Sequence, residues 1–102
     1  MLGRRVEVEL DLHEWVPDLT QQWSGGEEPR RASEEAARLG GEWPPGEQRA
    51  WEPHSSVRHR VGAVLDRYDD RGLVAVVCHS GVIEAMTGVR VTTPCSVVPY
   101  SP

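Results

Sequence analysis

The chain has 102 residues, enough for one small domain with a modest core. Apolar residues make up 38% of it, and four tryptophans partly compensate for the absence of phenylalanine. A net charge of −5, with acidic and basic residues interspersed, argues against a nucleic-acid partner. No apolar stretch approaches the roughly 20 residues that span a bilayer, and no signal-peptide pattern is present. We therefore expect a cytoplasmic protein with no membrane partner.

The first part of the chain predicts a short strand, a loop and a helix. Residues 6–10 alternate apolar and charged side chains, which is typical of a half-exposed strand. Residues 18–29 are polar and contain a Gly-Gly pair, which indicates a loop. A helical pattern then runs from Arg30 to Leu39, and Gly40 is its expected stop.

The middle of the chain carries the longest helical pattern. It extends from Glu47 to Tyr68 after a stiff turn rich in Gly and Pro, and Pro53 could interrupt it. Apolar side chains recur along it at helical spacing and predict an amphipathic stripe that packs on a sheet: Val57, Val61, Val64, Leu65 and Tyr68.

The last third of the chain contains the strongest strand signal. Residues 73–78 carry no charge and are rich in β-branched side chains, which predicts a strand buried on both faces of a sheet. A short helix over residues 82–86 follows, opened by Gly81 and closed by Gly88, and residues 95–99 predict an edge strand. The expected fold class is α/β: a mixed or mainly parallel sheet flanked by helices, with too few strands to be complete.

His79 is the first candidate functional residue. It follows the predicted strand directly and precedes the predicted helix. Ligands of α/β proteins bind at the carboxyl ends of strands, and free N–H groups at a helix N-terminus attract anions. A histidine in that position indicates phosphate chemistry.

Four segments resemble motifs of the histidine phosphatase (phosphoglycerate mutase-like) superfamily. They match "L-x-E", "P-x-G-E-S", "R-V-x-x-x-L" and "V-V-x-H-G-G-V-I", and they are Leu12–Trp15, Pro45–Gln48, Arg60–Leu65 and Val76–Ile83. Gln48 replaces the usual Ser, and Ser80 replaces a Gly. The chain resembles the C-terminal portion of such a protein over nearly its whole length. It would form one partial domain over residues 1–102, with residues 18–46 as a loop and helix insert.

The resemblance implies a site and a reaction. His79 would contact the phosphoryl group as imidazolium, and the N–H of Ser80 would donate to a phosphate oxygen. Glu14 would protonate the leaving oxygen and then activate water. The complete enzyme would hydrolyse or transfer a phosphate monoester through a phosphohistidine. The implied partner is a phosphorylated small molecule, with no metal and no other cofactor.

The family's nucleophile lies in an Arg-His-Gly motif that this sequence does not contain; the nearest string is Arg58-His59-Arg60. The nucleophile and a second pocket arginine would precede Met1, so we expect this chain to lack turnover alone. The alternative is a non-catalytic module that binds phosphorylated ligands or assembles with other chains. Its open sheet edges predict homo-oligomers.

Other interpretations of the same residues are weaker. His79 could be purely structural, and Glu14 could be an ordinary exposed carboxylate. A serine hydrolase needs Gly two residues before and after its nucleophile, which Ser80 lacks. A metal site would draw on His54, His59, Cys78 and Cys95, but the histidines are five residues apart and both cysteines are expected in the core as thiols. The tryptophans are expected to cover the core or line the pocket rim.

Overall fold

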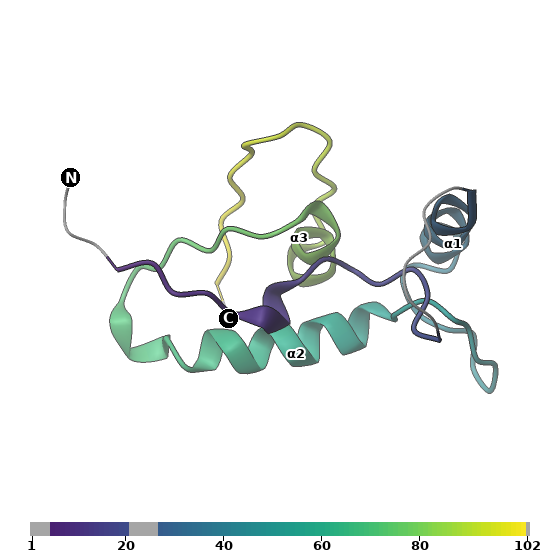
Figure 1. Cartoon of the computed structure of the whole chain (residues 1–102), viewed down its shortest axis with the longest axis horizontal. Helices are drawn as coiled ribbons and strands as arrows, with labels where there is room; N and C mark the ends of the chain where they lie inside the picture. Colours follow the sequence, from purple (N-terminus) through teal and green to yellow (C-terminus); the bar gives the residue numbers. More distant parts are fainter. Residues whose placement is uncertain (1–4, 21–26, 102) are drawn as a thin grey trace.

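The computed structural model of the chain describes residues 5–20 and 27–101 (Figure 1). Within them lie three α-helices and two short 3-10 helices. In chain order these are η1 (Leu10–Leu12), α1 (Glu27–Arg38), α2 (His54–Asp66), η2 (Asp69–Arg71) and α3 (Ser80–Thr87). No described helix is both long and apolar enough to cross a membrane.

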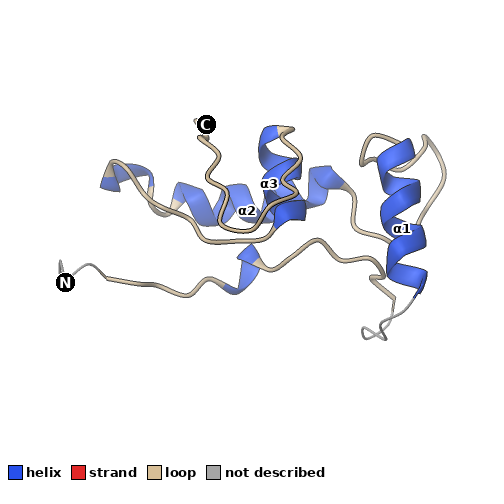
Figure 2. Ribbon diagram, turned by 90° about the horizontal axis from the view of Figure 1, so that it is seen from above, coloured by secondary structure: helices blue, strands red, loops and turns tan. Residues whose placement is uncertain are grey.

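The expected α/β fold is wrong. The described part of the chain contains no β-strand, and the segments between the helices are loops (Figure 2). All three predicted strands, at 6–10, 73–78 and 95–99, lie in such segments, except that Leu10 begins η1. A strand exists only where a neighbour pairs with its N–H and C=O groups, and the apolar pattern of one segment cannot supply that neighbour.

Burial of residues 73–78 also differs from the prediction. Leu73 is 100% exposed and Val77 93% exposed, whereas Cys78 is half-buried against the core. Cys95, expected in the core, is exposed, and so is Val97 in the predicted edge strand. The helices form the core instead, and these segments run over its outside.

The longest predicted helix is confirmed in its C-terminal part. α2 begins at His54, directly after Pro53, whose extended backbone (φ −71°, ψ 151°) places it at the N-cap. Residues 47–53 are not helical, because proline lacks an N–H donor and disfavours helical backbone in the residue before it. The predicted apolar stripe is confirmed, since Val57, Val61 and Val64 are buried and Leu65 and Tyr68 are half-buried. Its predicted partner is wrong, because α2 packs against α3 and not on a sheet.

The two other predicted helices are confirmed with shifted ends. α1 begins at Glu27, three residues before the predicted start, because Pro29 is tolerated in a first helical turn. α3 ends where Gly88 adopts the left-handed conformation (φ 76°), and the Gly88 N–H donates to the Glu84 carbonyl at 2.8 Å. Gly and Pro therefore set the helix ends much as the sequence indicates.

The hydrophobic core lies where α2 and α3 meet. Its buried members come from these two helices: Val57, Val61, Val82 and Ala85. Partly buried side chains surround them, including Leu12 from η1, Trp15 and Cys78. The chain measures 45 × 28 × 24 Å, and α3 lies beside the middle of α2 (Figure 1).

A second contact holds α1 at the other end of the chain. Trp51 is buried there together with Ala36 of α1. The Trp51 indole N–H donates to Glu35 at 2.7 Å, and the Trp43 indole N–H donates to the Trp51 carbonyl at 2.8 Å. Trp15 packs against the core cluster, as predicted, whereas Trp43 and Trp51 belong to this second contact, and Trp23 lies outside the described residues.

The core predicts a sharp difference between two valines. Val57 is fully buried, so Val57→Ala should lower the free energy of unfolding by about 2 kcal/mol through lost burial and a residual cavity. Val97 is 92% exposed, so Val97→Ala should leave stability unchanged. Urea denaturation followed by tryptophan fluorescence measures both, and equal effects would contradict this core assignment.

Candidate functional site

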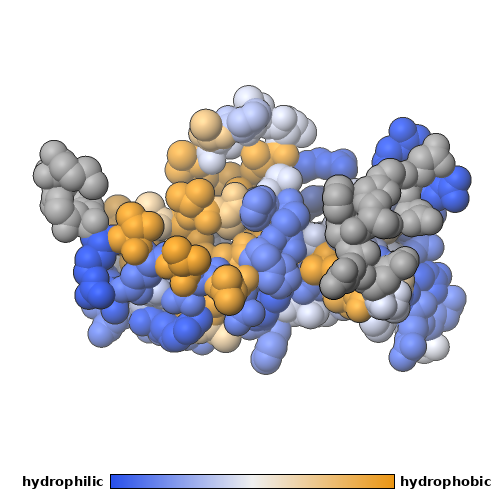
Figure 3. All heavy atoms as spheres, viewed as in Figure 1, coloured by the Kyte–Doolittle hydropathy of each residue, from blue (hydrophilic) through white to orange (hydrophobic). Residues whose placement is uncertain are grey.

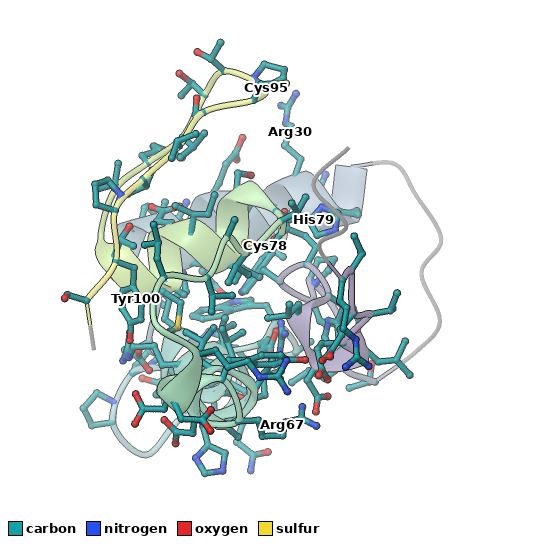
Figure 4. All side chains as sticks on the ribbon, turned by 90° about the vertical axis from the view of Figure 1, so that its left-hand side faces the viewer. Arg30, Arg67, Cys78, His79, Cys95 and Tyr100 are labelled. Carbon is teal, nitrogen blue, oxygen red and sulfur yellow. The ribbon has the colours of Figure 1, made fainter. Side chains whose placement is uncertain are left out.

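His79 lies at the start of α3 (Figure 4), and Ser80 follows it in the chain. His79 is the N-cap residue with extended backbone (φ −114°, ψ 162°), and Ser80 is the first helical residue. Both side chains are exposed. The predicted position of His79 in front of a helix N-terminus is therefore confirmed. The predicted place at the end of a central strand is wrong, since residues 73–78 form no strand.

Glu14 reaches the same helix end from the N-terminal part of the chain. Its Oε2 accepts a long hydrogen bond, 3.4 Å, from the Gly81 backbone N–H. Its Oε1 accepts from the Trp15 N–H at 2.8 Å, and the residue is half-buried. The structure thus brings Glu14 to the helix end that carries His79 and Ser80, across 67 residues of sequence.

Gly81 allows this close approach. A Cβ atom built on Gly81 would lie 2.5 Å from the Glu14 Oε1 atom and 2.9 Å from the Trp15 Cβ atom. Both separations are shorter than van der Waals contact, so a side chain would push the Glu14 segment off the helix. Glycine is needed here for space, since its φ is not in the left-handed region.

An ion pair fixes the segment that carries Glu14. Arg60 on α2 binds Glu52 in a two-point contact, with its Nε 2.8 Å from Oε2 and its Nη2 3.0 Å from Oε1. The same guanidinium donates to the Asp11 carbonyl at 2.5 Å and to the Glu14 carbonyl at 3.3 Å. We name this pair the Arg60–Glu52 clamp, because it ties residues 11–14 to α2.

Glu52 completes the clamp with its own backbone. Its N–H donates to the Val16 carbonyl at 2.9 Å, and its carbonyl accepts from the Trp15 indole N–H at 2.6 Å. The Glu52 Oε1 also accepts from the Val16 N–H at 3.2 Å. Residues 14–16 are therefore held on both sides, which sets where the Glu14 carboxylate points.

Glu52 is 3% exposed, yet it remains a charged partner. Burial alone would raise the pKa of its carboxyl. The hydrogen bonds and positive charge of Arg60 outweigh burial and hold the pKa below its usual value of 4.5. Sequence reasoning missed Glu52, because a glutamate just before a proline gives no periodic signal.

A hollow of about 310 Å³ opens beside α3. Its lining includes Cys78, Ser80, Thr93 and Cys95 and no charged residue. Ser80 faces both this hollow and the helix start, whereas Glu14 and His79 do not line it. The hollow itself supplies no cation for a phosphate.

The two cysteines on this rim are free thiols. Figure 4 shows Cys95 on the loop after α3 and Cys78 on the chain that enters the helix. Burial raises the pKa of the Cys78 thiol, which makes it a poor nucleophile.

The structure does not bring together the residues of the weaker interpretations. Within residues 5–20 and 27–101, no group of three or more His, Cys, Asp or Glu side chains could hold a metal ion. His54 packs against Gly41 at the start of α2, whereas His59 is exposed further along that helix. Arg58 pairs with Glu42 at 3.1 Å, outside the candidate site.

Comparisons with protein-family models, with curated proteins and with solved structures give no match to this chain.

The close approach at Gly81 can be tested with a matched pair of glycine variants. Gly81→Ala should lower the free energy of unfolding by about 1–3 kcal/mol, since the added methyl clashes with Glu14 and Trp15. Gly62, inside α2, has no atom within 4 Å of the equivalent position. Gly62→Ala should therefore raise stability by about 0.5–1 kcal/mol. Thermal or urea unfolding measures both, and a stabilising Gly81→Ala would contradict the described contact.

The clamp predicts both a stability loss and a change in acid sensitivity. Glu52→Gln leaves Arg60 without its charged partner and should cost about 3 kcal/mol. The pKa of Glu52 is lowered by folding, so its contribution is present above pH 4.5 and is lost as the pH falls through the folded value. The stability of the variant should thus fall less steeply in acid than that of the wild type.

Two controls sharpen this measurement. Glu34→Gln removes an exposed ion pair with Arg30 and should change stability by well under about 1 kcal/mol. Glu7 and Glu35 also have lowered pKa values, through hydrogen bonds from Tyr68 and Trp51, so some acid sensitivity remains in every variant. Equal acid profiles for wild type and Glu52→Gln would show that the clamp carries no such linkage.

Proposed function

We propose that this chain binds the phosphoryl group of a phosphate monoester at the start of α3. One observation carries the proposal: Glu14 and the His79-Ser80-Gly81 segment meet at a helix N-terminus, although 67 residues separate Glu14 from Gly81. Backbone N–H groups at such an end lack partners inside the helix and favour anions. The resemblance to histidine phosphatases, which assigns roles to these same residues, supports the proposal independently.

Each residue has a chemical role in the proposal. His79, as imidazolium, donates to a phosphoryl oxygen from its exposed N-cap position. The Ser80 N–H donates to a second oxygen. The Glu14 carboxyl faces the ester oxygen and shares a proton with it, which removes the repulsion between two anions. A proton in that place is also what general-acid catalysis of ester cleavage requires.

The proposed activity of this chain is recognition rather than turnover. Phosphohistidine chemistry needs a nucleophilic histidine in line with the ester bond, and the sequence contains no Arg-His-Gly motif to supply it. Hydrolysis or transfer of the phosphate would belong to a form that has such a histidine. The expected cytoplasmic location, which stays part of the proposal, suits a phosphorylated small molecule as ligand.

Phosphate titration of three variants tests the proposal. Glu14→Gln keeps an acceptor for the Gly81 N–H but removes a negative charge, so inorganic phosphate should bind about fivefold more tightly, equivalent to about 1 kcal/mol. His79→Ala should weaken binding, and His59→Ala, an exposed histidine of α2, should leave it unchanged. Calorimetry or phosphorus NMR measures all three.

Two outcomes would contradict the proposal. The first is phosphate affinity that does not respond to His79→Ala. The second is rapid, His79-dependent release of phosphate from p-nitrophenyl phosphate, because a chain that only recognises the phosphoryl group cannot produce it.

A further inference from the structure

We infer that two copies of this chain pair through residues 73–78, which form an antiparallel two-stranded β-ribbon across a two-fold axis. The segment is six residues long, close to the mean strand length, and it contains neither a charge nor a proline. Several of its apolar side chains are exposed to solvent, above all Leu73 and Val77. The inferred pairing does not depend on phosphate binding. The sequence predicts homo-oligomers through open sheet edges, whereas here one defined segment, residues 73–78, forms the contact.

The two faces of the segment differ in burial. Val74 and Val76 are less than half exposed, and Cys78 packs against the core, whereas Leu73 and Val77 are almost fully exposed. Exposure therefore alternates along the segment, as it does in a strand, with Val74 and Val76 at 40% and 41% and only Cys78 packed against the core. Within the described residues, no backbone hydrogen bond joins 73–78 to another segment. The segment thus combines unpaired backbone groups with exposed apolar side chains, which is a template for strand pairing.

Charge favours a second copy as the partner. A strand that pairs with an uncharged apolar segment must itself be nearly free of charge, or it places ionised groups against apolar ones. Residues 5–9 contain Arg5, Glu7 and Glu9, and the two carboxylates are already bound to Tyr68 and to arginines of the α2–η2 region. Residues 73–78 of another copy meet the requirement without any repulsion.

Charge also sets the direction of the pairing. A parallel, in-register pair would bring the charged η2 turns of the two copies, each with Asp69, Asp70 and Arg71, to the same end of the ribbon, which is unfavourable. An antiparallel pair separates these charges. A two-fold axis at Ala75 keeps the solvent faces of both strands on one side and sets Leu73 opposite Val77 of the second copy. The two most exposed side chains of the segment then cover each other.

Figure 3 shows apolar side chains gathered on one face, over the N-terminal segment and over the chain above α2. Val6, Val8 and Leu10 are exposed in the first of these places. These residues form a second exposed apolar surface through which two copies could associate. The experiment must therefore distinguish association through this surface from pairing through residues 73–78.

Light scattering after size-exclusion chromatography of the full chain tests the pairing. The wild type should shift from monomer to dimer as its concentration rises, and Val77→Lys should stay monomeric throughout the series. Val8→Lys and Val97→Lys, at equally exposed valines, should dimerise like the wild type. Circular dichroism of each variant verifies that the helices are intact. A monomeric wild type, an open-ended aggregate, or a dimer abolished by Val8→Lys and not by Val77→Lys would overturn the inference.

A cross-linking experiment tests the register. Ala75 lies opposite itself across the axis, where antiparallel Cα atoms are about 4.5–5.5 Å apart, within the range that a disulfide spans. In a Cys95→Ser background, Ala75→Cys should give a disulfide-linked dimer under mild oxidation, and Val97→Cys should give far less. Equal cross-linking at both positions would reject the proposed pairing.

Discussion

The buried pair between Arg60 and Glu52 is the contact on which the rest of the structure depends. It joins α2 to the turn before it and to the N-terminal segment by hydrogen bonds, beside the apolar contacts that Leu12 and Trp15 make with the core. Buried ion pairs contribute little net stability compared with apolar replacements, but losing one partner leaves an uncompensated charge. The pair therefore specifies one arrangement of the segments. In a chain with so small a core, that specificity matters more than its energy.

The clamp also connects stability with the candidate site. It holds residues 14–16 from one side, and α3 meets them on the other, with no room for a side chain at Gly81. The position of the Glu14 carboxylate is thus a consequence of packing at two places, the clamp on one side and the start of α3 on the other. A site built in this way is rigid on the glutamate side and open on the His79 side, where the side chain is exposed. In the phosphate site that we propose, the Glu14 carboxyl is the group held in place, and the exposed His79 is the group that can adjust to the ligand.

The features that could be predicted from the sequence are those that depend on neighbours along the chain. α2 and α3 follow from apolar spacing and from Pro53 and Gly88, which act within a turn of the helix. The predicted strand at 73–78 is wrong because a β-branched pattern indicates only that a segment can pair. Whether it does pair depends on a partner strand elsewhere in the chain. The role of Glu52 could not be predicted for the same reason, because its partner Arg60 lies eight residues away, beyond the start of α2. The meeting of Glu14 with α3 came from a family resemblance and could not come from any local pattern.

The apolar residues of this chain divide according to their spacing. Those at helical spacing are buried, since one helix face needs only one neighbour, and α2 and α3 provide it for each other. The apolar run at 73–78 is extended, so its side chains point to two faces, and a helix can cover only one of them. In residues 73–78 only Cys78 packs against the core, and Leu73 and Val77 are almost fully in solvent. A six-residue segment of this kind gains the most from another extended chain, because only an extended chain satisfies its backbone and covers its outer side chains together.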